Sequence, residues 1–474
     1  MAQTEQAPQE TRDDYYLGRA IHLATVAALG GFLFGFDTAV INGAVGAIEG
    51  GFEIGAGLLG FVVSSALLGC VAGAYLAGRL ADRIGRIRVM VLAASLFLIS
   101  AIGSGLAFGP WDLILWRVVG GLGVGAASVI APAYIAEISP ASIRGRLGSL
   151  QQMAIVTGIF IALLSDYFLA TAAGGAAEPL WGLTAWRWMF IAEVVPALAY
   201  GVLALTIPES PRYLVANHDE RTARGVLGSV MKHGIDNRMK EIKRTLAIDR
   251  RASVGDLVKP GGGNLLPIVW IGIALSVFQQ FVGINVIFYY SSTLWRSVGF
   301  TEQDALIQTV ITSVTNIAVT IVAILLIDKI GRRRLLTIGS TGMALTLGAL
   351  AWIFATAQQE ANAQGVLEPV LSDSAGVAAL ISANLFVVFF GMSWGPGVWV
   401  LLGEMFNNRI RSTALGVAAA AQWLANFAIS TTFPSFANIG LGFAYGFYTT
   451  FAVLSLLFVL KFVPETKGRE LEDM

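Results

Sequence analysis

One acidic side chain lies in the middle of an otherwise apolar stretch, and it is the residue in this chain best placed to do chemistry. Asp37 follows Gly-Gly-Phe-Leu-Phe-Gly-Phe at 30–36 and precedes Thr-Ala-Val-Ile-Asn-Gly at 38–43. An ionised carboxylate at the centre of a bilayer costs about 2.5–3.5 kcal/mol even on lenient scales. Such a residue is retained where it faces water, pairs with a cation or carries a proton for part of the time. We interpret Asp37 as a candidate proton carrier, with a permanent structural salt bridge as the alternative.

Arg117 is the candidate partner for Asp37, because it is the one basic residue in the interior of the fourth apolar run. Burial favours the neutral acid, whereas a nearby guanidinium favours the carboxylate. A small change in exposure therefore decides whether the proton is held. The glycine-rich run that follows, 120–125, allows a neighbouring helix to approach closely, and we interpret it as structural.

The composition is that of a helical membrane protein. Of the 474 residues, 55% are hydrophobic and 13% are charged, and the mean hydropathy is +0.70. A soluble chain carries about a quarter charged residues. The apolar runs are too long and too uniform for barrel strands, which alternate in polarity. The net charge of zero gives no support for nucleic-acid binding, and the single cysteine, Cys70, excludes an intrachain disulfide.

Twelve apolar runs are long enough to span a bilayer, six on each side of a polar centre. They cover residues 21–44, 58–78, 88–108, 113–135, 149–169 and 188–207, and then 265–295, 305–327, 335–357, 377–402, 413–436 and 442–462. The first nineteen residues are polar and acidic, unlike a cleaved signal, so we expect the first run to remain as a membrane span. Lys and Arg cluster after the second, fourth, eighth and tenth runs, and the opposite loops are mostly acidic. The positive-inside rule therefore predicts that both termini are cytoplasmic.

The two halves of the chain repeat each other, which is typical of transporters. Asp-Arg-Ile-Gly-Arg at 82–86 recurs as Asp-Lys-Ile-Gly-Arg at 328–332, and Pro-Glu-Ser at 208–210 recurs as Pro-Glu-Thr at 464–466. We predict an all-α polytopic fold with an N-terminal tail (1–19), a six-helix half (20–207), a cytoplasmic helical linker (208–263), a second, pseudo-symmetric six-helix half (264–463) and a C-terminal tail (464–474). The basic linker could bind anionic lipid, but we favour a solvated linker.

These motifs resemble those of the sugar porter branch of the major facilitator superfamily, which includes bacterial proton/sugar symporters and animal glucose facilitators. The resemblance covers nearly all of 32–468. It rests on GRLADRIGR at 78–86, RVVGGLGVG at 117–125, PESPR at 208–212, QQFVGIN at 279–285 and PETKG at 464–468. It implies a transporter with one sugar site between two halves that rock about it.

The resemblance implies that Asp37 and Arg117 form a pair in which protonation of the Asp releases the Arg. Asp37 stands where proton-coupled members have Asp and the animal facilitators have Asn, which favours symport. Glu193 matches a Glu that tunes this pair in bacterial symporters; the alternative is a carboxyl group bonded to neighbouring helix groups. We expect no cofactor, with the proton as the coupling ion.

A sugar site requires neutral amides for the hydroxyl groups and an aromatic platform for the flat apolar faces. Gln280 and Asn285 lie close enough in helical angle to share a cavity wall, whereas Gln279 faces differently. Aromatic residues at positions that the family uses for stacking or gating complete the set. The candidate substrate-binding residues are Phe34, Gln152, Gln279, Gln280, Asn285, Tyr289, Tyr290, Asn316, Phe390, Trp399, Gln422, Trp423 and Asn426. The alternative is that the amides only pack against one another.

Charged residues at the predicted cytoplasmic ends of the helices form two matching sets. Glu137 and Arg144 recur at the same spacing as Glu404 and Arg411. Single charges at helix ends contribute little, but a matched network would latch a cytoplasmic gate in the outward-open state and release it in the inward-open state. The candidate gate comprises Asp82, Arg86, Glu137, Arg144, Glu209, Asp328, Arg332, Glu404, Arg411 and Glu465.

We therefore expect a proton-coupled hexose symporter of the cell membrane that works as a monomer by alternating access, with membrane lipid around it. Ile159 replaces a second Gln of the bacterial xylose symporter, and Gly391 replaces a Glu of the facilitators. On Ile159 we favour glucose over xylose, galactose or myo-inositol. The other hypotheses are an uncoupled facilitator and a membrane sugar sensor. An enzyme or a metal site is disfavoured, because His22, His218 and His233 show no catalytic or metal-ligand spacing.

Overall fold

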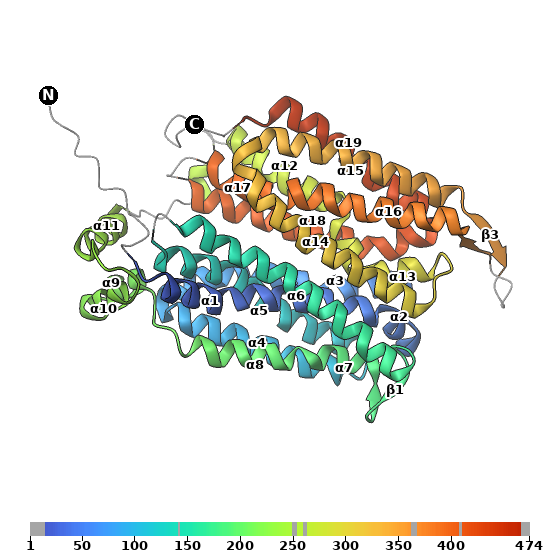
Figure 1. Cartoon of the computed structure of the whole chain (residues 1–474), viewed down its shortest axis with the longest axis horizontal. Coiled ribbons are helices and arrows are strands. Elements are labelled where there is room, and N and C mark those ends of the chain that lie inside the picture. Colours follow the sequence, from blue (N-terminus) through green and yellow to red (C-terminus); the bar gives the residue numbers. More distant parts are fainter. Residues whose placement is uncertain are drawn as a thin grey trace.

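Two bundles of long helices lie side by side, the N-terminal one blue to green and the C-terminal one yellow to red (Figure 1). The structure, a computed structural model, describes residues 15–140, 143–248, 254–258, 263–361, 367–406 and 410–465. Within these residues, twelve helical segments are long and apolar enough to cross a membrane. The prediction of twelve spans is confirmed.

The N-terminal half contains six of these segments, and two of the six are divided. Its elements are α1 (Leu17–Ala39), α2 (Ile41–Phe52), α3 (Ala56–Ile84), α4 (Arg86–Gly105), α5 (Pro110–Ile138), α6 (Arg144–Ala173), β1 (Pro179–Leu180), β2 (Leu183–Thr184), α7 (Ala185–Ala192) and α8 (Val194–Ala204). The first span was predicted to end at residue 44, which is wrong: α2 continues to Phe52, and its buried Val45 and Ile48 belong to the hydrophobic core that both halves share.

Three short helices form the linker. They are α9 (Pro211–Ala216), α10 (Glu220–Val230) and α11 (Ile235–Ile248), followed by the 3₁₀ turn η3 (Val254–Leu257). Asp219 caps α10 by accepting a hydrogen bond from the backbone N–H of Thr222. Its hydrogen bonds with the side chain and with the backbone N–H of Thr222 lower the pKa of the Asp219 carboxyl. Lys243 on α11 lies 2.6 Å from Glu220 on α10, and this contact lowers the pKa of Glu220.

The C-terminal half repeats the arrangement of the first. Its elements are α12 (Pro267–Phe281), α13 (Ile284–Arg296), α14 (Glu302–Ile330), α15 (Arg332–Ala355), β3 (Gln358–Ala361), β4 (Leu367–Val370), α16 (Asp373–Phe389), the π-helical turn η4 (Phe390–Trp394), α17 (Gly395–Met405), α18 (Arg411–Ile439) and α19 (Leu441–Phe462). The all-α, twelve-span fold with two matching halves was predicted correctly from the sequence.

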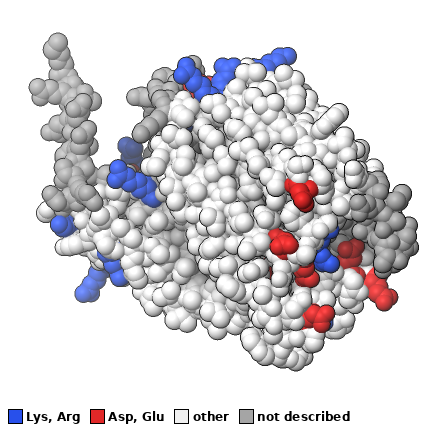
Figure 2. Space-filling model, turned by 45° about the vertical axis from the view of Figure 1, so that its right-hand side comes forward, with Lys and Arg blue, Asp and Glu red and all other residues white. Residues whose placement is uncertain are grey.

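The two ends of the bundle differ in charge. We call the end that carries α9–α11 the linker end, and the end that carries the β1–β2 and β3–β4 hairpins the hairpin end (Figure 1). Figure 2 turns the hairpin end forward: acidic side chains gather on it, most Lys and Arg lie toward the other end, and a broad uncharged face separates them. This is the pattern that a bilayer imposes on a spanning protein.

Several membrane helices are interrupted, and the interruptions have local causes. Pro196 has no N–H to donate to the carbonyl of Ala192, and the helix is divided into α7 and α8 at Glu193. Gly283 adopts φ +82° between α12 and α13, and a Cβ there would lie 2.7 Å from the ring of Tyr448. The π-helical turn η4 separates α16 from α17. Interrupted spans expose polar backbone groups where a ligand can reach them.

Glycines bring helix backbones of the N-terminal half into direct contact. A Cβ on Gly121 of α5 would lie 1.9 Å from the carbonyl oxygen of Ala66 on α3, and a Cβ on Gly69 of α3 would lie 2.2 Å from that of Val118. Gly35 on α1 and Gly158 on α6 meet the facing backbone in the same way. The structural interpretation of the glycine-rich run 120–125 agrees with this packing.

We expect Gly121→Val to destabilise the protein by about 1–3 kcal/mol or more, because the added side chain would force α3 and α5 apart. The measurement is the melting temperature of the purified protein in detergent. Gly78→Val is the matched control, since a Cβ on Gly78 of α3 would meet nothing within 4 Å. Equal melting temperatures for the two variants would contradict the close packing of these helices.

Candidate functional site

Asp37 and Arg117 lie side by side inside the N-terminal half. Their exposed fractions are 1% and 2%. The Nη1 atom of Arg117 lies 3.7 Å from Oδ1 of Asp37 and donates a hydrogen bond of 2.9 Å to the backbone carbonyl of Asp37. Its Nη2 atom donates to the carbonyl of Val63 at 3.3 Å. The guanidinium therefore keeps two backbone partners whether or not the Asp37 side chain is ionised.

Glu193 completes a buried group of three charged residues. It lies at the break between α7 and α8, is 1% exposed, and interacts electrostatically with both Asp37 and Arg117. Neither of its carboxyl oxygens has a hydrogen-bond partner in the part of the chain that the structure describes. The alternative that Glu193 is bonded to neighbouring helix groups therefore lacks support. Two carboxyl groups within electrostatic range of one guanidinium form an arrangement in which a proton can be shared.

Small residues shape the space around the Asp37 carboxyl group. A Cβ on Gly120 of α5 would lie 3.0 Å from Oδ1 of Asp37 and 2.4 Å from the hydroxyl of Ser100. Gly120 is therefore the member of the glycine-rich run whose lack of a side chain admits the carboxyl group itself.

The amides of α12 and α13 meet at the helix break. The Nδ2 atom of Asn285 donates to Oε1 of Gln280, and Nε2 of Gln280 donates to Oε1 of Gln279 at 3.4 Å. Gln279 in turn donates to the backbone carbonyls of Trp394 at 2.8 Å and Gly395 at 3.2 Å. Gln279 is thus committed to protein partners, whereas Gln280 and Asn285 mainly hold each other.

A second polar group joins α13 to α18. Asn426 donates to the hydroxyl of Tyr289 at 3.4 Å and accepts from Ser430 at 3.0 Å, and the Tyr290 hydroxyl donates to the Ser430 carbonyl at 2.7 Å. Tyr289 also interacts electrostatically with Asp37 and Arg117. This tyrosine is hydrogen-bonded to Asn426 and lies within electrostatic range of the buried charges.

Aromatic residues lie across the boundary between the halves. The rings of Phe34 on α1 and Trp423 on α18 are 5.6 Å apart between centroids. Phe390 begins η4, and a Cβ on the neighbouring Gly391 would lie 3.6 Å from the amide oxygen of Asn316. Five predicted residues make no hydrogen bond or ring contact with the amides or with the Phe34–Trp423 pair among the described residues: Gln152, Asn316, Phe390, Trp399 and Gln422. Trp399 is 41% exposed.

The candidate gate residues form one hub in each half, at the linker end. Arg86 donates from Nε and Nη2 to the two carboxylate oxygens of Glu137 at 3.1 and 2.9 Å, and its backbone N–H donates to Glu209 at 3.0 Å. Asp82 lies 3.5 Å from the same guanidinium. Arg332 repeats these bonds with Glu404, at 3.1 and 2.7 Å, and with Glu465, at 3.0 Å. The side chains of Arg144, Asp328 and Arg411 lie outside what the structure describes.

Sequence analysis missed two polar residues at membrane depth. Asp166 on α6 is fully buried, and the rule that singled out Asp37, an acid inside an apolar run, would have found it. Asn42 donates from Nδ2 to the carbonyl of Phe288 at 2.8 Å and to the hydroxyl of Ser291 at 2.9 Å. No sequence signal distinguishes Asn42 from a packing amide, because its partners are on the other half of the chain.

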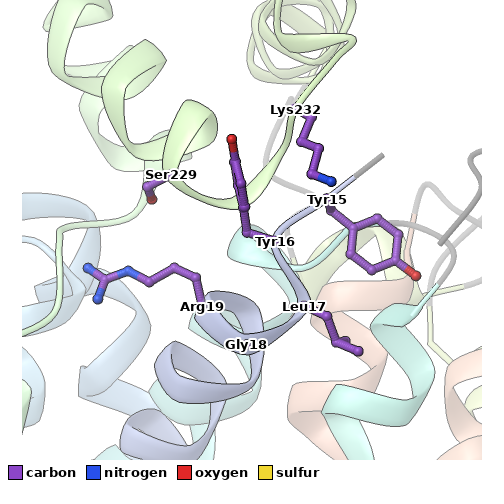
Figure 3. Close-up of a pocket in the computed structure, with 7 residues that line it drawn as sticks. All are labelled: Tyr15, Tyr16, Leu17, Gly18, Arg19, Ser229 and Lys232. Atoms are coloured by element: carbon purple, nitrogen blue, oxygen red, sulfur yellow. The ribbon is translucent and has the colours of Figure 1, made fainter. Parts of the chain in front are cut away.

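A hollow of about 790 Å³ lies apart from these residues, where α1 begins beside the linker (Figure 3). It is lined by Tyr15, Tyr16, Leu17, Gly18, Arg19, Ser229 and Lys232. The ammonium of Lys232 lies 5.5 Å from the centroid of the Tyr16 ring. This surface hollow shares no residue with the amides or the buried charges and does not belong to the candidate site.

Comparisons with known proteins identify the family and the fold of this chain. The family profile described as "Sugar (and other) transporter" matches residues 23–474. The chain is 59% identical over 455 residues to the "Glucose transport protein" of Synechocystis sp., covering 95% of this chain and 96% of that protein. It is 39% identical over 487 residues to the "D-xylose-proton symporter" of Escherichia coli, covering 95% and 94%. The structure resembles the partially occluded, inward-open xylose transporter XylE of E. coli with a TM-score of 0.81 at 37% identity, covering 96% of this chain and 100% of that one.

Proposed function

We propose that this chain, which belongs to the sugar transporter family of the major facilitator superfamily, carries a monosaccharide together with a proton across the cell membrane, and that the sugar is glucose. It is a multi-pass membrane transporter. The relative named for glucose is more similar to this chain than the relative named for xylose, which supports a hexose. Xylose, galactose and myo-inositol remain the alternatives to test.

The observation that carries the proton-coupling proposal is the buried group of Asp37, Arg117 and Glu193. A permanent structural salt bridge would satisfy both partners, but Oδ2 of Asp37 and Nε of Arg117 have no hydrogen-bond partner among the described residues. A guanidinium 3.7 Å from a carboxylate, with a second carboxyl group in electrostatic range, supports an exchangeable proton. An uncoupled facilitator has no use for this group.

We assign the basic linker end to the cytoplasm and the acidic hairpin end to the outside, on the positive-inside rule. The two halves are bonded near the hairpin end, through Asn42 with α13 and through Glu302 on α14, which accepts from the backbone N–H of Ala176 at 2.8 Å. Closure of the outer side supports an inward-facing state. The similarity to an inward-open transporter agrees with it.

In the proposed cycle, Asp37 takes a proton from outside and weakens its hold on Arg117, while the sugar binds to the amides. Gln280, Asn285 and Asn426 supply neutral donors and acceptors, and Trp423 supplies an apolar face. The halves then rock and the inner side opens. Renewed contact between Arg117 and Asp37 expels the proton into the cytoplasm, and the paired geometry in the structure supports this last step.

We propose that the two hubs act as the cytoplasmic gate. We also propose that the boundaries predicted from the sequence, between the tails, the two six-helix halves and the linker, separate the parts that move. Gly85 and Gly331, at φ +97° and +95°, leave room for the carboxylates of Glu209 and Glu465, which accept from the backbone N–H groups of Arg86 and Arg332. In the described residues, the bonds of Arg86 and Arg332 lie within one half. Each hub would hold its own half together and contact the other half when the inner side closes. We further propose that the transporter works as a monomer.

The function is tested by adding sugars to lightly buffered vesicles that contain the purified protein, oriented with the hairpin end outward. We expect glucose to make the medium alkaline as protons enter with the sugar, and unlabelled glucose to compete best against labelled glucose in a panel with xylose, galactose and myo-inositol. Uptake of glucose without alkalinisation of the medium would indicate an uncoupled facilitator and contradict proton symport. Stronger competition by another sugar would reassign the substrate and leave the coupling intact.

A further inference from the structure

Asp166 is a buried carboxyl group that the proposed cycle does not use. It lies on α6 with an exposed fraction of 0%. Its Oδ2 atom accepts a hydrogen bond of 3.3 Å from the backbone N–H of Gly43, and its Oδ1 atom has no partner among the residues that the structure describes. Unlike Asp37, it forms no ion pair with a guanidinium in the part of the chain that the structure describes.

The helices around Asp166 supply no charge to balance it. The element α6 packs against α1, α14, α7, α5 and α2. The acidic and basic residues with described side chains on those five helices are Arg19, His22, Asp37, Glu49, Asp112, Arg117, Glu137, Arg187, Glu302 and Asp304. None of them forms an ion pair with Asp166, and within the described part of the chain the Gly43 N–H is its one hydrogen-bond partner. An ionised carboxylate in this place would be buried without a counter-charge, whereas a neutral carboxylic acid would lose much less on burial.

The Asp166 carboxyl group is hydrogen-bonded to Gly43, the residue that follows Asn42, and Asn42 makes the contact with α13 that closes the outer side. Gly43 follows Asn42, whose carbonyl accepts from the Ser292 hydroxyl at 2.6 Å and whose side-chain oxygen accepts from the Ser292 N–H at 3.2 Å. A Cβ on Gly43 would lie 2.7 Å from Cβ of Asp166. The backbone that carries the bonds to α13 therefore rests on the Asp166 side chain. We call the bonds of Asn42 with Phe288, Ser291 and Ser292 the outer seal.

We propose that Asp166 is a second proton-binding site, which controls closure of the outer seal. In the outward-facing state, external water reaches the carboxylate and a proton binds to one of its oxygens. The neutral acid is the form that the closed seal accommodates. The proposal rests on the orientation given under the proposed function, but it does not depend on sugar coupling.

The proton on Asp166 returns to the outside. The side chain is fully buried while the outer side is closed, so it has no contact with cytoplasmic water in this state. When the outer seal reopens, the proton leaves by the way it came. Asp166 therefore changes the pH dependence of closure without adding to the number of protons transported per sugar.

The test measures how accessible the outer seal is at different external pH values, in the absence of sugar. Cys70, the only cysteine, is replaced by Ala, and Val45, fully buried on α2, is replaced by Cys as the reporter. A membrane-impermeant maleimide is added from outside between about pH 5 and about pH 8, a range over which a buried carboxyl group can change its protonation state. Labelling is divided by that of a Trp181→Cys protein, exposed on the β1–β2 hairpin, to remove the pH dependence of thiol reactivity. All proteins carry Asp37→Asn, so that the Asp37 proton plays no part.

We expect relative labelling to fall with acidification by up to about tenfold per pH unit, the limit for one proton bound per closure. Adding Asp166→Asn should give low labelling at every pH, because a neutral side chain always permits closure. Asp166→Ser serves the same purpose if the amide does not fold. Asp112→Asn, which removes another carboxylate of the hairpin end, should leave the pH dependence unchanged.

Two results would overturn the proposal: pH dependence that survives Asp166→Asn, or labelling that ignores pH while Asp166 is present. A third measurement uses the chain with its native Asp37. The ratio of protons to sugar should be the same with Asp166→Asn as without it, and a changed ratio would make Asp166 part of the transport path instead. Failure of glucose to alkalinise the medium would remove the symport proposal and leave these outcomes unaffected.

Discussion

Asp37→Asn should abolish the accumulation of sugar against its gradient while leaving exchange of labelled for unlabelled sugar within about threefold of the wild-type rate. An amide has nearly the shape of the carboxylic acid but cannot take up or release a proton. A pH difference of one unit is worth about 1.4 kcal/mol, and with one proton per sugar it sustains about a tenfold sugar gradient. The variant should equilibrate the sugar and stop at a ratio of about one.

We expect the Asp37→Asn protein to fold, because Arg117 keeps other partners when the carboxylate is removed. Removal of one partner from a buried ion pair commonly costs about 3–5 kcal/mol, because a charge is left without compensation. Arg117, however, also donates to the carbonyls of Asp37 and Val63, and Glu193 interacts with it electrostatically. We therefore expect a folded protein whose melting temperature falls by a few degrees, not one that fails to assemble.

The measurement compares uptake of labelled glucose into vesicles that are acidic outside with uptake into vesicles without a pH gradient. Glu49→Gln is the control, since it removes a carboxylate of the same span that lies away from Arg117 and interacts with Arg296. Accumulation by the Asn variant in response to the pH gradient would refute the assignment of Asp37 as the proton carrier.

Gln280→Leu should raise the KM for glucose by about tenfold to a hundredfold with little change in the melting temperature. A neutral hydrogen bond contributes about 0.5–1.5 kcal/mol net, and one amide can make two or more to a polyol. The Nε2 atom of Gln280 can make them, because it is held by a long bond of 3.4 Å to Gln279, whereas the Oε1 atom already accepts from Asn285. Leucine preserves the volume and removes the bonds.

The neighbouring residue supplies the matched control. Gln279→Leu should lower the melting temperature and leave the KM less affected, because its amide already donates to the carbonyls of Trp394 and Gly395. Those carbonyls would lose their donor, at a cost of about 1–3 kcal/mol. Both properties are measured on each variant. The opposite result, with affinity lost in the Gln279 variant and stability lost in the Gln280 variant, would exchange the two roles.

The sequence predicts the parts of this protein that follow from hydrophobicity and from internal repetition. Twelve apolar runs predict the spans because a backbone in lipid must be helical or part of a closed barrel, and these runs are too long and too uniform for barrel strands. The recurrence of Asp82-to-Arg86 at Asp328-to-Arg332 predicts two matching hubs, and the structure contains one in each half. The neighbourhood of Asp37 and Arg117 was also foreseeable, since buried charges require partners.

Features that depend on contacts between distant segments were beyond sequence analysis. The bonds of Asn42 with Ser291 and Ser292 join residues of different halves, and no local pattern indicates them. The difference between Gln279 and Gln280 depends on where η4 presents its carbonyls. Gln152 and Trp399 were included because of residue type and position alone, and among the described residues they make no hydrogen bond or ring contact with the amides. Their roles remain predictions.

The glycine contacts of the N-terminal half also bear on mechanical stiffness. Where Gly69 and Gly121 meet a facing backbone, two helices touch without side chains that could change rotamer between them. In the C-terminal half, Gly339 and Gly342 instead face the side chains of Ser393 and Phe389, beside the π-helical turn. We expect the N-terminal half to move as a rigid body and the C-terminal half to deform during the transport cycle. Hinge motion, vibrational softness and tolerance to evolutionary substitution should therefore be greatest in the C-terminal half.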